Sequence, residues 1–272
     1  NLLSDFAKKA IENENLGSDN ITDFLSVSFS STDYIGHTMG PRSIEIQDTY
    51  LRLDETIADF LTYLDKKIGK GNYLVFLTAD HAGAENVTHL KDNRYDVDNI
   101  NRKNFENDLR RFSEKTYGID VLLDYSNFNL FFNKPLLAAN SIDLNQVKQD
   151  FKNYLYQQKA VKRVYTEEEI LAGSATDSYL NFISKGYDPV QNGELVFTYK
   201  PGYIEYSAVG TSHGTPYTYD THVPLIFFGW KIPKGASYAK KEITQIAPTL
   251  AFQLKTTLPN ATDAEVLEEV IR

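Results

Sequence analysis

The sequence contains no cysteine, no long apolar run and no excess of positive charge. Because cysteine is absent, disulfides and thiolate metal sites are excluded, and any bound metal must use oxygen and imidazole ligands. No segment approaches the roughly 20 consecutive apolar residues of a membrane-spanning helix. The net charge of −9 argues against a nucleic-acid or anionic-membrane binder, since such proteins need a basic surface.

A phosphorylated substrate is still compatible with this acidic chain, because bound divalent metals can reverse the sign of a local field. The 272 residues, 42% of them apolar and 24% charged, are typical of a globular protein with one large domain or one domain that carries an insertion. The chain lacks an initiator Met, and its start at Asn1–Asp5 shows neither a basic region nor an apolar signal segment. We therefore expect a processed or truncated product whose targeting signal lies outside this sequence.

The first pair of chemically active residues is Asp33 and His37, four positions apart. The apolar run at 23–29 predicts a strand before them, and the apolar spacing over 41–68 predicts a long amphipathic helix after them. We expect the pair to lie in the connecting loop, where Gly36 would let the backbone turn so that both side chains converge.

A second pair, Asp80 and His81, follows the continuous apolar run at 73–77. Such a run is typical of a strand buried on both faces of a parallel sheet. A strand–loop–helix–strand order predicts a right-handed βαβ unit, and ligands bind at the carboxyl ends of its parallel strands. The two pairs together therefore predict a metal site at that edge.

Three further histidines are present. His213 lies in a glycine-rich loop just before the buried strand predicted at 223–229, so it is a third candidate ligand. Imidazole and carboxylate ligands suit Zn²⁺, with Mn²⁺ or Mg²⁺ as alternatives where carboxylates dominate. His89 is expected on the surface, and His222 is expected to order its loop or to support a ligand. The aromatic-rich stretch 199–219 is typical of packing between subdomains, with the lining of a substrate site as the alternative.

The domain prediction separates a metal-binding α/β core, residues 1–83 and 205–272, from an inserted α+β subdomain, residues 84–204. The insertion begins where the sequence turns polar after Gly83. Elements are predicted from hydrophobic periodicity and turn residues. The remaining predicted helices are 2–14, 104–115, 142–157, 167–171, 178–184 and 243–254, and the remaining strands are 119–124, 127–132, 161–165 and 194–199.

The motifs taken together resemble the alkaline phosphatase superfamily. The stretch 31–41 has the pattern D-x-x-x-H-x-x-G-P with a glycine before the histidine, and 77–81 and 212–214 follow in the family order. This pattern is most similar to the type I phosphodiesterase/nucleotide pyrophosphatase branch and to the bacterial phosphate-irrepressible alkaline phosphatases. The segment 243–251 is similar to the closing helix of that superfamily. The resemblance implies an α/β fold with a mainly parallel sheet flanked by helices, of which this chain would be the carboxyl-terminal portion.

The resemblance also implies a two-zinc site. Asp33, His37 and His213 match the ligands of one zinc, and Asp80 and His81 match two ligands of the other. The two metals would neutralise charge on a transferring phosphoryl group and stabilise the attacking and leaving oxygens.

One part of the family pattern has no match here. The Ser/Thr nucleophile, another Asp ligand and the Lys/Arg contacts that select monoesters belong to the upstream half of the family, so the catalytic nucleophile is expected upstream of Asn1. The expected function is the carboxyl-terminal part of a zinc-dependent phosphate monoester hydrolase, inactive by itself, with partial or no zinc occupancy possible. The alternatives are a phosphodiesterase/nucleotide pyrophosphatase and a catalytically silent metal-binding fragment.

The expected partners and location follow from the same resemblance. They are a phosphorylated small-molecule substrate and the missing amino-terminal segment, with no nucleic acid and no membrane span. Without its upstream strands the sheet would have an open edge, which predicts self-association. A periplasmic or extracellular location is implied.

Overall fold

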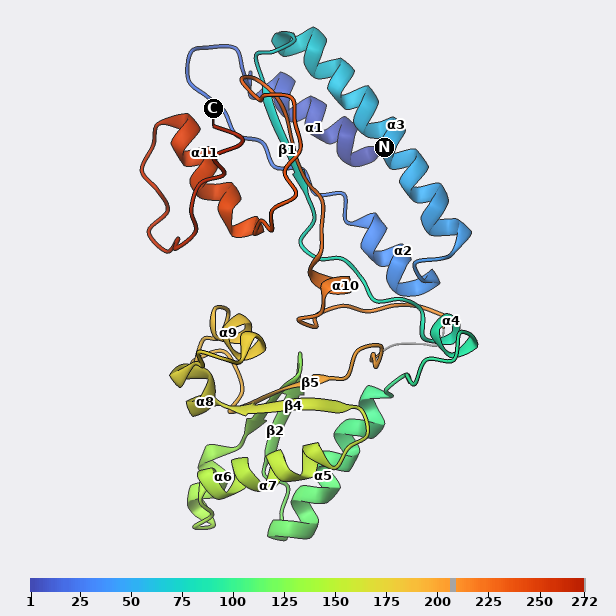
Figure 1. Ribbon diagram of the computed structural model, residues 1–272, viewed down its shortest axis with the longest axis vertical. Coiled ribbons are helices and arrows are strands. Elements are labelled where there is room, and N and C mark those ends of the chain that lie inside the picture. Colours follow the sequence, from blue (N-terminus) through green and yellow to red (C-terminus); the bar gives the residue numbers. More distant parts are fainter. Residues whose placement is uncertain (206–208, 272) are drawn as a thin grey trace. The chain divides into compact units, whose positions relative to one another are not determined.

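The computed structural model of the protein describes residues 1–205 and 209–271 (Figure 1). The chain divides into two compact units. The first comprises residues 1–33, 44–80 and 223–272, and the second comprises 34–43 and 81–222. No helix within the described ranges is long and apolar enough to span a membrane.

The first unit is built around two helices and a two-stranded ribbon. Apolar side chains of α1 and α3 let the two helices pack on each other, and α1 buries Ala7 and Ile11. The elements of this unit are α1 (Leu2–Asn13), α3 (Ile44–Leu64), the short π-helix η1 (Asp65–Gly69), β1 (Leu74–Thr78), β6 (Leu225–Gly229), the 3₁₀ helix η2 (Ile243–Gln245) and α11 (Ile246–Leu254).

Strands β1 and β6 pair antiparallel, with Phe76 opposite Phe227. The prediction that β1 belongs to a parallel βαβ unit is therefore wrong within the described residues. The segment 23–29, predicted as a strand, joins no ladder among the described residues, although the rings of Phe24 and Phe76 stack with centroids 6.1 Å apart. Every residue of β1 is half-buried, so the expected burial on both faces is also absent. Apolar content alone could not show that a strand lacks neighbours.

The second unit contains a four-stranded antiparallel sheet in the order β2–β3–β5–β4. Helices α5 and α7 pack against this sheet, and α8 packs against β4. The elements are α2 (Ser31–Met39, at the boundary between the units), α4 (Val87–Asp92), α5 (Arg102–Tyr117), β2 (Leu122–Ser126), β3 (Asn129–Phe132), α6 (Lys134–Ala139), α7 (Leu144–Tyr156), β4 (Val161–Thr166), α8 (Glu167–Ala172), α9 (Ser178–Ser184), β5 (Leu195–Tyr199) and α10 (Thr218–Thr221).

The largest hydrophobic core lies under this sheet. Leu109, Phe151 and Phe197 are fully buried there, contributed by α5, α7 and β5. Full burial of a Leu or Phe side chain stabilises the fold by about 1.5–3 kcal/mol. The second unit therefore has a hydrophobic core of its own, and it also includes the segments that carry His37, His81 and His213.

Candidate metal centre

Asp33 and His37 lie on helix α2, which corrects the prediction that they occupy a loop. Residues four apart in a helix project from the same face, so the helix itself brings the carboxylate and the imidazole together. Gly36, expected to turn the backbone, is an ordinary helical residue, and the left-handed glycine is Gly40 after the helix end.

The structure places His213 beside this pair. Ligating atoms of Asp33, His37 and His213 all lie within 4.8 Å of one another, and each side chain is half-buried. His37 and His213 are separated by 176 positions in the sequence, yet their Nε2 atoms are 3.1 Å apart. Two nitrogen ligands of a tetrahedral zinc with bonds of 2.0–2.1 Å are separated by roughly 3.3 Å. The two imidazoles therefore converge as ligands of one metal would.

A backbone carbonyl orients the ring of His37. Its Nδ1 lies 2.8 Å from the carbonyl oxygen of Thr211, so a proton on Nδ1 can be donated to that oxygen. This tautomer leaves Nε2 as the nitrogen that faces His213 and can accept a metal. Histidine ligands in metal sites are usually fixed by this kind of second hydrogen bond.

His81 lies against the same cluster. Its ring stacks on that of His213 with centroids 3.3 Å apart and an angle of 15° between the planes. The Nδ1 of His81 is 2.9 Å from the carbonyl oxygen of Ala82, so a proton on Nδ1 can be donated to that oxygen. Three of the predicted ligand histidines thus meet at one place in the fold.

The loops that carry His81 and His213 are tied together by backbone hydrogen bonds. The N–H of Ala84 donates to the carbonyl of Ser212 at 3.1 Å, and the hydroxyl of Thr211 donates to the carbonyl of Ala84. These bonds hold the two loops in register across more than 120 residues of intervening sequence. The histidines are therefore positioned by the protein itself.

A buried aspartate supports the same loops, through its carboxylate on one side and its backbone carbonyl on the other. Asp220, only 2% exposed, accepts hydrogen bonds from the backbone N–H and the hydroxyl of Thr215. The N–H of Ala82 donates to the carbonyl oxygen of Asp220 at 2.8 Å. Burial raises the pKa of the Asp220 carboxyl above its ordinary value, and the bonds from Thr215 oppose that shift.

The other sequence-predicted residues fall outside the three-ligand group. Among the described residues, no group of three or more ligating side chains includes Asp80 or His81. His222 is exposed at the end of α10. His89 was expected on the surface, but it is half-buried on the short helix α4.

Sequence reasoning missed Asp220 and Thr215. The only signal for them was a carboxylate embedded in an aromatic stretch shortly after His213, where an acidic group is costly unless it is hydrogen-bonded. That signal does not reveal which donor it faces.

Most of the chain matches known proteins of the family that the sequence motifs resemble. The family described as type I phosphodiesterase / nucleotide pyrophosphatase matches residues 1–218. Among curated proteins, the alkaline phosphatase PafA of Elizabethkingia meningoseptica is 36% identical over 99% of this chain, and the alkaline phosphatase PhoV of Synechococcus elongatus is 35% identical over 98%. A protein of Myroides odoratus named calcium-transporting ATPase is 38% identical over 99% of this chain. The chain spans about half the length of these relatives, 50%, 48% and 50% respectively.

Solved structures have the same architecture. The crystal structure of PafA superposes with a TM-score of 0.94 over 99% of this chain and 52% of its own. Human ectonucleotide pyrophosphatase / phosphodiesterase 5, at 14% identity, matches over 85% of this chain with a TM-score of 0.58 and supports the fold alone. The predicted alkaline-phosphatase-like α/β fold, present only in part, is thereby confirmed. The chain belongs to the type I phosphodiesterase/nucleotide pyrophosphatase family of the alkaline phosphatase superfamily.

Proposed function

We propose that this chain is the metal-binding part of a metal-dependent phosphate monoester hydrolase. The observation that carries the proposal is the convergence of Asp33, His37 and His213 within 4.8 Å in a chain of this family. The monoester assignment is supported by the alkaline phosphatases PafA and PhoV, each about one-third identical to this chain.

The donor set fits zinc. One carboxylate and two imidazoles without thiolate are common zinc ligands, and three protein ligands leave a position for water or substrate. In our proposal Asp33, His37 and His213 hold one zinc, while Asp80 and His81 contribute to a second. When bound, the metals would neutralise negative charge on the transferring phosphoryl group.

Residues of this chain position the proposed metal ligands. Thr211 orients His37, and the stack of His81 on His213 brings ligands of the two proposed zinc sites together. We place the nucleophile, a Thr or Ser, in the upstream half of the family pattern, so that this chain alone is inactive. Residues 84–204 are proposed as the inserted subdomain, and the location as periplasmic or extracellular.

A phosphodiesterase or nucleotide pyrophosphatase activity is the second candidate, because the matched family carries that description. Hydrolysis of an ATP phosphoanhydride, to which the name of the Myroides relative refers, is also a phosphoryl transfer. Comparing 4-nitrophenyl phosphate with bis(4-nitrophenyl) phosphate separates these activities. A monoester hydrolase should show at least a 100-fold higher kcat/KM for the first substrate, and the reverse preference would establish the diesterase.

Elemental analysis and activity assays of this 272-residue chain test the proposal that it binds the metal while the nucleophile lies upstream. Zinc that copurifies and is lost in a His213→Ala variant, without hydrolysis of either ester, supports a metal-binding part that needs the upstream half. Robust turnover by the chain alone would overturn the upstream position of the nucleophile. A silent metal-binding fragment would be indicated if the complete protein also hydrolysed neither ester.

A further inference from the structure

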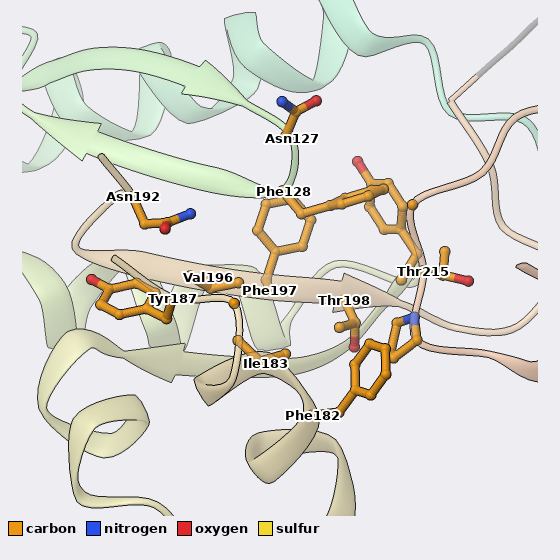
Figure 2. Close-up of a pocket in the computed structure, with 14 residues that line it drawn as sticks. Asn127, Phe128, Phe182, Ile183, Tyr187, Asn192, Val196, Phe197, Thr198 and Thr215 are labelled. Carbon is orange, nitrogen blue, oxygen red and sulfur yellow. The ribbon is translucent and has the colours of Figure 1, made fainter. Parts of the chain in front are cut away.

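A cavity of about 230 Å³ lies in the second unit, beside the loop that carries His213 (Figure 2). Its walls come from the β2–β3 turn, from α9 and the segment after it, from β5, and from residues 214–216. None of these residues belongs to the three-ligand group. The metal centre therefore does not account for the cavity.

Several aromatic side chains line the cavity. Phe128, Phe182 and Phe197 line it, and Phe182 is 55% exposed. Figure 2 shows the rings of Phe128 and Phe182 projecting into the same space from the β2–β3 turn and from α9. A solvent-exposed aromatic ring in the wall of a cavity can pack on a planar ligand.

Phe128 lies in the left-handed backbone region, with φ of +62°, directly after Asn127 at +48°. The two residues form the turn that joins β2 to β3, and a two-residue turn with both φ values positive favours glycine at the second position. A phenylalanine there costs of order 1–3 kcal/mol of backbone strain. Its ring packs edge-on against Phe197 and Tyr199, with centroids 6.0 and 5.6 Å away.

The cavity reaches the residue next to a metal ligand. Gly214, which follows His213, lines it with φ of +106°. A Cβ atom on Gly214 would lie 3.3 Å from the ring edge of Phe128. Thr215, which Asp220 fixes through two hydrogen bonds, lines the same wall. One side of the cavity is thus the segment that immediately follows His213.

The size of the cavity restricts its occupant. An apolar cavity of about 150 Å³ is enough to hold benzene, whereas sites for drug-sized ligands measure about 300–1,000 Å³. A single ring therefore fits, and a complete nucleotide does not.

We propose that this cavity binds the aromatic ring of an aryl phosphate ester, the group that leaves as a phenol. The proposal rests on the function proposed above, because the phosphoryl group would then lie at the metal centre. The strained Phe128 and the exposed Phe182 provide the two faces that pack on the ring. The site would favour aryl over small alkyl monoesters.

The kinetic test uses the complete protein with phenyl phosphate and methyl phosphate. Because the two esters differ in intrinsic reactivity, the quantity to follow is how a variant changes the ratio of their kcat/KM values. Phe182→Ala should lower the phenyl-to-methyl ratio about tenfold, since it removes one face of the ring site. Leu171→Ala, at an apolar residue on α8 that is 61% exposed and lies outside the cavity, should leave the ratio unchanged.

Binding of 4-fluorophenol to the protein, followed by fluorine NMR, tests the cavity without turnover. Saturable binding that Phe182→Ala weakens and Leu171→Ala does not would support the proposal. An unchanged kinetic ratio, or binding that Phe182→Ala leaves intact, would overturn it. If neither ester is hydrolysed, the function proposed above fails, and the fluorine signal alone then decides whether the cavity binds an aromatic ring.

Discussion

Asp220 accepts two hydrogen bonds from Thr215, one from its backbone N–H at 2.8 Å and one from its hydroxyl at 2.6 Å. Thr215 is only two residues from His213, and the backbone of Asp220 receives the N–H of Ala82, next to His81. Asp220 therefore supports the segments that carry two of the proposed zinc ligands, the His213 segment through its carboxylate and the His81 segment through its backbone carbonyl.

Replacing Asp220 with alanine should weaken the metal centre without removing a ligand. The change leaves two buried donors of Thr215 without an acceptor, which costs about 2–4 kcal/mol of folding stability. We expect zinc affinity, measured by isothermal titration calorimetry, to fall about 10–100-fold. Asp124→Ala, an exposed carboxylate on β2, is the matched control. Unchanged zinc affinity in Asp220→Ala would show that Asp220 does not position the histidines.

The ligand assignment predicts a sharper loss. His213→Ala and His37→Ala should each lower zinc affinity by more than about 100-fold, because a site with three protein ligands loses one of them. Titration with Co²⁺ would report the geometry through its absorption spectrum. His222→Ala should bind like the wild type, since His222 is exposed and lies outside the ligand group. Equal loss in all three variants would contradict the assignment.

Half-buried and exposed residues alternate along β6, and the exposed ones are apolar, which predicts self-association. Ile226 and Phe228 are 54% and 47% exposed on a strand whose pairing in the described residues is with β1. Exposed apolar residues on an open sheet promote association between copies. Sedimentation velocity should show concentration-dependent oligomers that a double substitution, Ile226→Lys and Phe228→Lys, reduces. Tyr238→Lys, at a side chain 98% exposed, should leave the distribution as it is. Monomers at every concentration would refute the prediction.

Tyr217 should make stability depend on pH in the alkaline range. Its hydroxyl donates to the carbonyl of Tyr199 at 2.6 Å, and burial raises its pKa from 10 to about 12. Because the folded-state pKa is the higher one, its contribution is complete below pH 10 and is lost as the pH rises towards 12. Tyr217→Phe should cost about 1 kcal/mol at neutral pH.

The check is a series of urea unfolding experiments on both proteins from pH 7 to 11.5. The difference in unfolding free energy should stay constant up to pH 10 and then shrink. A difference that grows above pH 10 would contradict the raised pKa, because it would mean that the folded state binds the phenolate better than the unfolded chain does.

Local patterns predicted most elements of this protein. The apolar periodicity that predicted helices at 142–157 and 178–184 corresponds to α7 and α9, because amphipathic spacing directly reports which face of a helix is buried. The hairpin prediction was shifted: the turn lies at Asn127 and Phe128, two residues beyond the expected position. Phenylalanine rarely occupies a turn position with positive φ, so the sequence pattern predicted the turn at residues 125–126 instead.

The candidate site was predictable as a set of residues but not as an arrangement. The grouping of Asp33, His37 and His213 was predicted from their motifs, yet the helix that carries the first two was taken for a loop. Phe128 packs on residues distant in sequence, and the backbone carbonyl of Asp220 bonds to distant Ala82, which no local pattern contains. The pairing of β1 with β6 likewise depends on which other strands could form hydrogen bonds with β1.

The hydrogen bond from Ala84 to Ser212 joins two points that are 128 residues apart in the chain. A segment whose two ends meet at 3.1 Å leaves and re-enters the structure at one place. Its length and fold can therefore change during evolution without displacing His81 or His213, provided that both ends still reach this junction. The same junction marks where an engineer could shorten the segment, or replace it with another domain whose termini lie close together.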